Sequence, residues 1–340
     1  EWACSFVLNL EKRSRGVKPV DLDLCTHSHI TQYVQDKGLT KRQALAITHI
    51  LWDPCSLFLQ QVTNGKILYR NLLTAEPHLT WTDKIAPASV PLWEKYLHQL
   101  LEIKDLKVPR CGLPEGWRNG LSLCLSTDGS QSCSVGRAFL RSDQADSSGR
   151  HPTTYLCGTS KLNERGVHAA IKSECNALLI TCRMAEQIVV TFGGEPNIKF
   201  TEIIICTDSK ALLAIVQMDP SRLKLWFISR VGEIVHLMTS LNMKLVFARS
   251  EFCDADAASK LNLEDNFTLS PTYWSSKFYY KPKEEWPIEA AAPVDPDMAS
   301  SIAAEISNSK LTVMATNVME DEIINRLLQR FDNFFKIQKT

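Results

Sequence analysis

The sequence predicts an α/β fold, a mixed five-stranded sheet flanked by helices, and three observations predict it. First, the run TEIIICTDSKALLAIV over residues 201–216 begins as a β-branched strand and turns helical after an acid. Second, three short strand patterns and one long helical pattern precede this run. Third, another long helical pattern, a strand and a last helix follow it. The resulting order is β, β, β, α, β, α, α, β, α.

The first two strands form a predicted hairpin. The segment LSLCLSTDGSQSCSVGRAFLR alternates as a strand, places Asp128 near its end and turns at Gly129 and Ser130. The chain then returns through residues 136–140 as the hairpin partner. A third short strand follows in HPTTYLCGTSKL.

Two long helices are predicted from apolar spacing. The first covers residues 169–190, without a break, and carries Glu174 in its first turns. The second covers residues 222–241, and a strand over 244–248 follows it. Its apolar residues recur at helical spacing: Leu223, Phe227, Val231, Ile234 and Leu237.

Asp208 stands at the carboxyl end of the central strand. The run Ile203–Ile205 is typical of a strand that is buried on both faces. Ligands of open α/β sheets bind beyond the carboxyl ends of strands, so Asp208 is a site candidate. The alternative is that Asp208 only caps the helix that begins at Ser209.

Four carboxylates come from separate elements of this fold. The last helix pattern, CDADAASKL, adds Asp254 and Asp256 to the acids already named. Crowded carboxylates repel one another unless a cation is present, and Mg²⁺ prefers oxygen ligands. Two such ions about 4 Å apart can activate a water and stabilise a leaving oxygen. The predicted metal-binding and catalytic set is Asp128, Glu174, Asp208 and Asp256.

The segment from Leu121 to Leu261 resembles a ribonuclease H domain. STDGS, SECNALL, CTDSKALL and DADAASK match the four acidic stations of that family in order and spacing. More narrowly, the chain resembles the polyprotein (Pol) of BEL/Pao-type LTR retrotransposons. The flanking segments TKRQALAITHILWDPCSLF, LTWTD, LKVPRC, SRLKLWFISRVGEI and SPTYWSSKFYYKPKEEWP support this narrower resemblance.

The resemblance implies hydrolysis of the RNA strand of an RNA–DNA hybrid by two Mg²⁺ ions, with Mn²⁺ as an alternative. Asp128 and Asp208 would be shared by the ions, Glu174 would complete one site and Asp256 the other. The minor groove and 2′-hydroxyls of the hybrid would select the strand. Implied partners are the hybrid and the rest of the Pol polyprotein, with its reverse transcriptase palm and integrase. The implied locations are the cytoplasm, in a virus-like particle, and the nucleus.

The chain departs from the ribonuclease H pattern in two places. Many members carry a mobile histidine nine or ten residues before the last acid, where this chain has Phe247 and Val246. Asp254 also competes with Asp256 for the fourth station, and Asp256 is preferred because it aligns with the Ala-Asp pair ahead of the final helix. Two other functions stay open: a catalytically weak or domesticated nucleic-acid-binding module, and a Pao-type aspartic peptidase. The peptidase would need Asp-Thr-Gly or Asp-Ser-Gly, whereas this chain has Thr127-Asp128-Gly129.

Composition sets further bounds. The chain has 340 residues, of which 44% are hydrophobic and 22% are charged, and this composition predicts a globular intracellular protein of two domains. The sequence contains no apolar run of 18 residues, so no membrane span is expected. The balance of 38 basic and 38 acidic residues lacks the basic excess of most nucleic-acid binders, although local basic clusters occur at 12–15 and 41–42. Eleven cysteines without a C-x-x-C pair are expected to be reduced and mostly buried rather than zinc ligands. The first residue is Glu, which favours a piece of a longer polyprotein.

Residues 1–117 are expected to be a thumb- or connection-like region of a reverse transcriptase. A strand and a poorly patterned linker fill residues 1–38, and helices follow over 40–51, over 58–73 and from Pro91. The first of these has a capping box, with Thr40 at the N-cap and Gln43 three residues later. The third helix is expected to present Leu92, Tyr96 and Leu100 or Leu101 on one face.

The ribonuclease H-like domain is expected over 118–262, a linker over 263–316, and a helix leading toward integrase over 317–340. The amphipathic pattern of that helix covers Glu320–Lys339. The polymerase signature of two adjacent Asp after an aromatic residue is absent, so no polymerase site is expected. Aromatic residues interrupt the linker and are expected to dock it onto the domain, with base stacking as the alternative. They are Tyr273, Trp274, Phe278, Tyr279, Tyr280 and Trp286.

Overall fold

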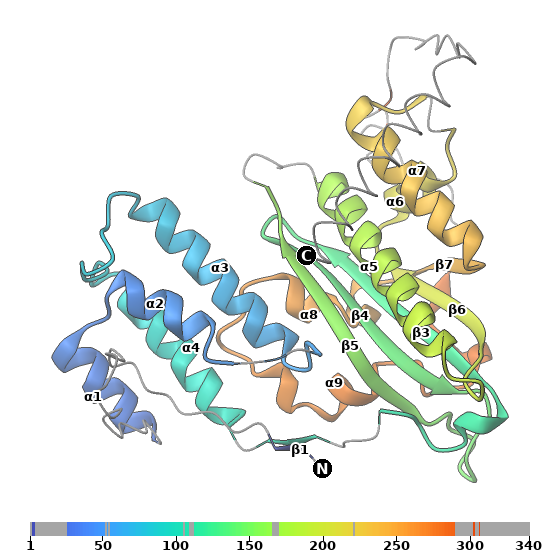
Figure 1. The fold of residues 1–340 in the computed structure, drawn as a ribbon, viewed down its shortest axis with the longest axis horizontal. Helices are drawn as coiled ribbons and strands as arrows, with labels where there is room; N and C mark the ends of the chain where they lie inside the picture. Colours follow the sequence, from blue (N-terminus) through green and yellow to red (C-terminus); the bar gives the residue numbers. More distant parts are fainter. Residues whose placement is uncertain are drawn as a thin grey trace, which may run out of the picture.

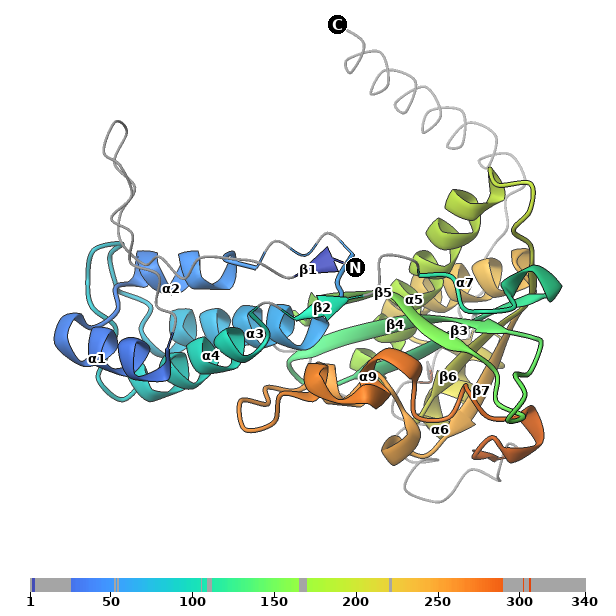
Figure 2. The ribbon, with the colours of Figure 1, turned by 90° about the horizontal axis from the view of Figure 1, so that it is seen from below.

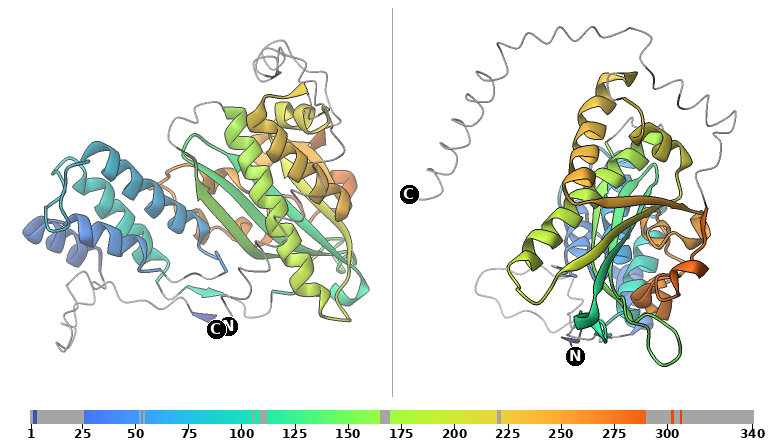
Figure 3. Two further views of the ribbon diagram at one scale, coloured as in Figure 1. Left: turned by 45° about the horizontal axis from the view of Figure 1, so that its top comes forward. Right: turned by 90° about the vertical axis from the view of Figure 1, so that its right-hand side faces the viewer.

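The computed structural model describes residues 2–3, 26–51, 53, 55–104, 106–108, 112–164, 170–219, 222–289, 302 and 306. A helical module built from the N-terminal third lies beside a sheet with its own helices (Figure 1, Figure 3). The helix expected over 320–339, the basic cluster 12–15 and most of the strand expected near the N-terminus lie outside the described residues.

The main sheet has the strand order β5-β4-β3-β6-β7-β8. Its strands are β3 (Leu121–Gly129), β4 (Cys133–Ser142), β5 (Thr153–Leu162), β6 (Phe200–Thr207), β7 (Met243–Ala248) and β8 (Ile288–Glu289). The first three run antiparallel, β6 runs parallel to β3, and β7 runs parallel to β6. The predicted mixed sheet is confirmed, but the predicted count of five strands was one short. The sixth strand, β8, has two residues and therefore no periodicity that a sequence could display.

Helices α5 (Ala170–Gly193) and α7 (Leu225–Ser240) cover one face of this sheet (Figure 2). The short helix α6 (Lys210–Val216) joins the same core. Alternate strand residues such as Leu123, Leu125, Ile203 and Ile205 point into it. This helix was predicted to begin at residue 222, whereas α7 begins at Leu225. Leu223 lies before the helix, where it is buried and forms an isolated β-bridge with Ile306.

By length and composition α5 alone among the described helices would be able to cross a membrane, although no apolar run of that length was expected. In the fold, eleven of its residues are buried, and they face the sheet and α7. Its apolar composition is therefore explained by its place in the core of an α/β layer.

The chain after β7 covers the opposite face of the sheet. It contains η3 (Ser250–Phe252), α8 (Asp256–Ser259), η4 (Phe267–Leu269), α9 (Pro271–Ser275) and η5 (Lys283–Glu285). The expected docking of its aromatic residues is confirmed, since Tyr273, Phe278, Tyr279 and Trp286 are buried against Phe139. Residues 263–289 are thus packed structure rather than linker. The aromatic residues of this segment stand between prolines at spacings that show neither the helical nor the strand period. The sequence pattern therefore predicted a linker.

Two arginines of β4 lie inside this aromatic layer. The Arg137 guanidinium is fully buried, lies 4.0 Å from the centroid of the Tyr273 ring, and donates to the carbonyl oxygens of Asp254 and Tyr273. Arg141 donates to the carbonyl oxygen of Tyr279. Both side chains thus tie the docked segment to the middle of the sheet.

The helical module contains α1 (His27–Lys37), α2 (Lys41–Thr48), α3 (Leu59–Ala75) and α4 (Val90–Glu102). The capping box of Thr40 and Gln43 is confirmed. Helix α1 was missed, because only Ile30, Tyr33 and Val34 are buried in a largely polar stretch. Of the residues expected on one face of α4, Tyr96 and Leu100 are buried, whereas Leu92 is 45% exposed; Trp93 is buried as well.

The module is joined to the sheet by short elements. They are β1 (Trp2–Ala3), which pairs with β2 (Lys107–Val108), and η1 (Trp117–Asn119). All eight described cysteines are free and six are buried, as the sequence predicted.

Candidate metal and catalytic site

The predicted acids gather where two neighbouring parallel strands end. Asp128 lies near the end of β3, and Asp208 directly follows β6, whose Thr207 is paired with Thr127. Glu174 reaches the same place from the beginning of α5. One carboxylate oxygen from each of these three residues lies within 4.8 Å of the others. The structure therefore brings together three of the four predicted site residues directly.

The hydroxyl of Ser209, not the carboxylate of Asp208, caps the helix that follows. Ser209 Oγ accepts from the backbone N–H of Leu212, at 3.3 Å. The alternative role of Asp208 as the N-cap is thereby removed, and its carboxylate is left for the acidic cluster.

Gly129 allows α5 to come this close. A Cβ at residue 129 would lie 2.3 Å from the carbonyl carbon of Ser173 and 2.5 Å from the backbone nitrogen of Glu174. A side chain there would therefore push the helix away from the end of β3. The Gly129 backbone N–H is also near enough to the Glu174 carboxylate to lower its pKa. The sequence indicated only a turn at Gly129.

The three converging carboxyls resist ionisation in the metal-free protein. The pKa of Glu174 is raised to about 9, mainly by burial and in addition by the charges of Asp128 and Asp208. The pKa of Asp128 is likewise raised, to about 6, mainly by burial, although the Ser259 hydroxyl acts in the opposite direction. The pKa of Asp208 is also raised, mainly by burial. Such shifts are what closely spaced acids show when no cation neutralises them.

Two oxygens of this cluster have no hydrogen-bond partner among the described residues. They are Asp128 Oδ2 and Glu174 Oε2, both inaccessible to solvent. A buried carboxylate oxygen without a partner is costly, and a cation coordinated there would remove the cost. Since every available donor is an oxygen, the cluster fits a hard divalent cation such as Mg²⁺ or Mn²⁺.

Asp256 lies at the rim of the cluster. It begins α8, and its side chain is 30% exposed. Its Oδ1 lies 2.5 Å from Lys260 Nζ and 3.4 Å from Ser250 Oγ. Its oxygens do not converge with the other three, but its charge raises the pKa of both Asp128 and Asp208.

Asp254 is part of the core instead. It is fully buried, and its carboxylate accepts from Ser276 Oγ at 2.6 Å and from the backbone N–H of Lys277 at 3.0 Å. These contacts explain why two acids stand so close in the sequence: one holds the docked segment and the other faces the site.

Two further residues at the site were missed. Lys260 is a cation supplied by the chain itself, and the charges of Asp256, Asp128 and Asp208 raise its pKa. The i, i+4 spacing of Asp256 and Lys260 was a signal for this pair. The Ser250 hydroxyl lies in the loop where a histidine was sought; it donates to Asp256 Oδ1 and lowers the pKa of Asp208. Phe247 itself is a sheet residue, paired with Thr207 and Glu289.

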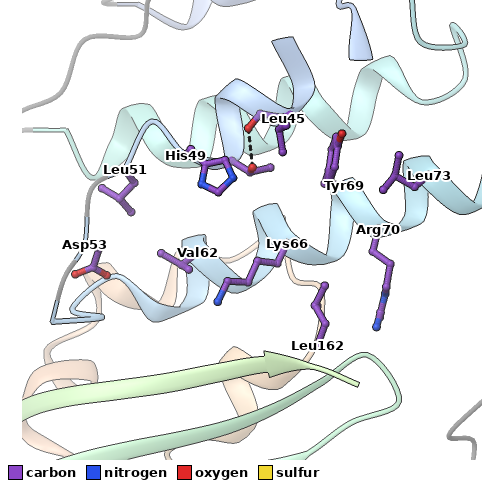
Figure 4. Close-up of a pocket in the computed structure, with 11 residues that line it drawn as sticks. Leu45, His49, Leu51, Asp53, Val62, Lys66, Tyr69, Arg70, Leu73 and Leu162 are labelled. Carbon is purple, nitrogen blue, oxygen red and sulfur yellow. Dashed lines mark hydrogen bonds between the residues drawn. The ribbon is translucent and has the colours of Figure 1, made fainter. Parts of the chain in front are cut away.

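A separate cavity lies away from the acidic cluster. It has a volume of about 370 Å³ and lies between α2, α3 and the end of β5 (Figure 4). Its one carboxylate, Asp53, accepts from the backbone N–H groups of Leu57 and Phe58. Lys66 Nζ donates to Ser160. These polar groups serve the local structure, so the cavity does not compete with the acidic cluster as a reactive centre.

Solved structures similar to parts of the chain include ribonucleases H and a viral reverse transcriptase. RNase H1 from the archaeon Halobacterium salinarum NRC-1 is 14% identical, with a TM-score of 0.28, over 40% of this chain and 93% of that one. LC9-RNase H1 is 12% identical, with a TM-score of 0.30, over 58% and 87%. The foamy viral protease-reverse transcriptase in complex with an RNA/DNA hybrid is 15% identical, with a TM-score of 0.29, over 59% and 28%.

No curated protein matches the chain. A family model does match it, the Pao retrotransposon-like RNaseH-like domain, over residues 40–209. This match begins at the first residue of the capping box of α2 and ends just after Asp208, so it includes three of the four acids. Because the match covers half of the chain, the chain belongs to the Pao retrotransposon-like RNaseH-like domain family.

Proposed function

We propose that this chain hydrolyses the RNA strand of RNA–DNA hybrids, with two divalent cations held by its acidic cluster. The observation that carries the proposal is the convergence of Asp128, Glu174 and Asp208, with two buried oxygens that lack partners. Membership of a retrotransposon family supports the choice of substrate, because such elements copy RNA into DNA.

The cations would be Mg²⁺, with Mn²⁺ as an alternative. Asp128 and Asp208 would be shared between the two ions, Glu174 would complete one site and Asp256 the other. When bound, the ions would supply an activated water and stabilise the leaving oxygen of the phosphodiester.

The chain's own residues prepare this site. The backbone N–H of Gly129 favours the ionised form of Glu174 by lowering its pKa, and Glu174 Oε2 is buried without a hydrogen-bond partner among the described residues. The Ser250 hydroxyl donates to Asp256, and Lys260 balances the charge of Asp256 while the site contains no other cation. Glu174 would also help to hold the region of the RNA 2′-hydroxyl, which distinguishes RNA from DNA at the cleaved strand.

The wider setting is part of the proposal, and family membership supports it. The partners would be the polymerase palm and the integrase of the same polyprotein, in a cytoplasmic virus-like particle and later in the nucleus. The three converging acids all belong to this chain. The cleavage chemistry is therefore tested first on this chain by itself.

A direct test is cleavage of a labelled RNA–DNA hybrid by the purified chain in Mg²⁺ and in Mn²⁺. Duplex DNA is the substrate control, and Asp208→Asn is the variant control. Loss of RNA only from the hybrid, only with metal and not in the variant is the expected result. Cleavage that persists in Asp208→Asn would refute the assignment of the site. Binding of the hybrid without any cleavage would favour the alternative of a binding module.

A further inference from the structure

The helical module reaches the last acid of the site through α3. An apolar cluster joins Leu59 and Ile67 of α3 to Val135 of β4 and to Ala255 and Ala258 around α8. Figure 1 shows α8 between α3 and the sheet. The short helix that begins with Asp256 is therefore packed between the module and the hairpin that carries Asp128.

A buried amide holds the chain where it leaves α8. Asn64 of α3 is fully buried; its Nδ2 donates to the carbonyl oxygen of Asn262 at 2.6 Å, and its Oδ1 accepts from the Asn262 N–H at 3.2 Å. Gln99 of α4, 3% exposed, accepts from Asn64 Nδ2 and donates to the same carbonyl at 3.1 Å. We call this arrangement of Asn64 and Gln99 around the Asn262 backbone the amide clamp.

The other side of α8 is held by the β3–β4 hairpin, which carries Asp128. Ser130, in the turn after Asp128, donates to the carbonyl oxygen of Ser259 at 2.6 Å. A helix of four residues cannot hold its own position, since most of its backbone groups lack intrahelical partners. Its place is therefore set by contacts with Ser130 on one side and with α3 on the other.

We propose that Asn64 is a positioning residue for Asp256: the amide clamp of the helical module fixes the exit of α8 and so holds the fourth acid at the rim of the site. The module then acts as a structural part of the metal centre, beyond any contact with nucleic acid. This inference rests on the proposed function for the role of Asp256, whereas the fixing of α8 can be tested without it.

The test compares Asn64→Ala with Gln61→Ala. Gln61 is an equally buried amide of the same helix, but it bonds Asn266 and Thr268, further along the chain. Metal-free protein is followed by hydrogen exchange and mass spectrometry, and Mn²⁺ binding is followed by electron paramagnetic resonance. Asn64→Ala is expected to speed exchange in residues 256–261 by about tenfold or more, and Gln61→Ala by less than about twofold. Mn²⁺ affinity should fall by about tenfold in Asn64→Ala alone, as expected for a residue that orients a ligand.

Cleavage of the hybrid adds a second readout. In Asn64→Ala we expect kcat to fall while KM for the hybrid stays unchanged, because the clamp does not touch substrate. If Asn64→Ala does not fold, Gln99→Met removes both bonds that Gln99 makes in the clamp, and its bond to the Asp265 carbonyl, at nearly equal volume. It leaves the two bonds between Asn64 and the Asn262 backbone, so it should show the same effects more weakly. Unchanged exchange in residues 256–261, or equal losses in Gln61→Ala, would overturn the inference. Failure of the unaltered chain to bind Mn²⁺ would instead overturn the proposed function.

Discussion

Glu174 offers the sharpest test of the electrostatics of the site. Its pKa is raised from an ordinary 4.5 to about 9, chiefly by burial. In the unfolded chain the same carboxyl ionises near its ordinary value. Protons are therefore bound more tightly by the folded protein, and the associated stability is fully present below pH 4.5 and is lost as the pH rises toward 9.

The size of this effect follows from the shift. Each pH unit between the two pKa values costs about 1.4 kcal/mol, so the penalty at pH 7 is roughly 3 kcal/mol at most. Replacing Glu174 by Gln removes the ionisation and keeps an oxygen that can accept from the Gly129 N–H. Metal-free Glu174→Gln should therefore be more stable than the unaltered chain at pH 7, by up to roughly 3 kcal/mol, and equally stable near pH 4.5.

Urea unfolding in EDTA at pH 4.5, 7 and 9 measures this difference. Glu186→Gln is the matched control, since Glu186 is an exposed acid of the same helix. Added Mg²⁺ should stabilise the unaltered chain and the control but not Glu174→Gln, because only binding to the folded state raises stability. A metal-free Glu174→Gln that is no more stable than the unaltered chain at pH 9 would refute the reasoning.

Three further outcomes are expected. Asp208→Asn should lower cleavage of the hybrid by roughly 10³-fold, in line with the several kcal/mol that a metal supplies, and an initial-rate assay at saturating Mg²⁺ checks this. Gly129→Ala should cost about 1–3 kcal/mol in urea unfolding and weaken Mn²⁺ binding, because its Cβ has no room beside Ser173; unaltered binding would contradict the close approach of α5. Asp254→Asn should lower thermal stability and leave the specific activity of the folded fraction unchanged. Asp256→Asn should lower the specific activity and leave thermal stability unchanged. The assignment of the fourth acid would be refuted if the two variants showed each other's results.

The central sheet could be predicted because its signals are local. Strand residues such as Ile203 and Ile205 repeat with the period of a pleated strand, and the helix that follows begins at a capping serine. Helix α1 and strand β8 have no such period, since they are formed by contacts between residues far apart in the sequence. The buried amides Asn64 and Gln99 were equally invisible, because residues of these types are mostly exposed.

The order and spacing of the four acids predicted that Asp128, Glu174 and Asp208 lie together, but the distances needed the fold. The sequence left Asp254 and Asp256 as rivals, and only the structure separates a core carboxylate from one at the rim. The role of Gly129 in admitting α5 depends on the lack of room for a Cβ, which would lie 2.3 Å from Ser173, a residue more than 40 positions further along the chain. Such steric limits leave no trace in a residue pattern.

The segment that runs from Asn262 to β8 also determines which fragment of this chain can stay monomeric. It covers Phe139 and Tyr155 on the sheet and pairs with the exposed side of β7 through Ile288 and Glu289. A protein cut at residue 262, the end of the motif-bearing region, would leave an aromatic sheet surface and an open strand edge in solvent. Bare edges and apolar faces are templates for self-association, so such a fragment would aggregate during expression. The shortest useful recombinant form therefore extends at least to Glu289.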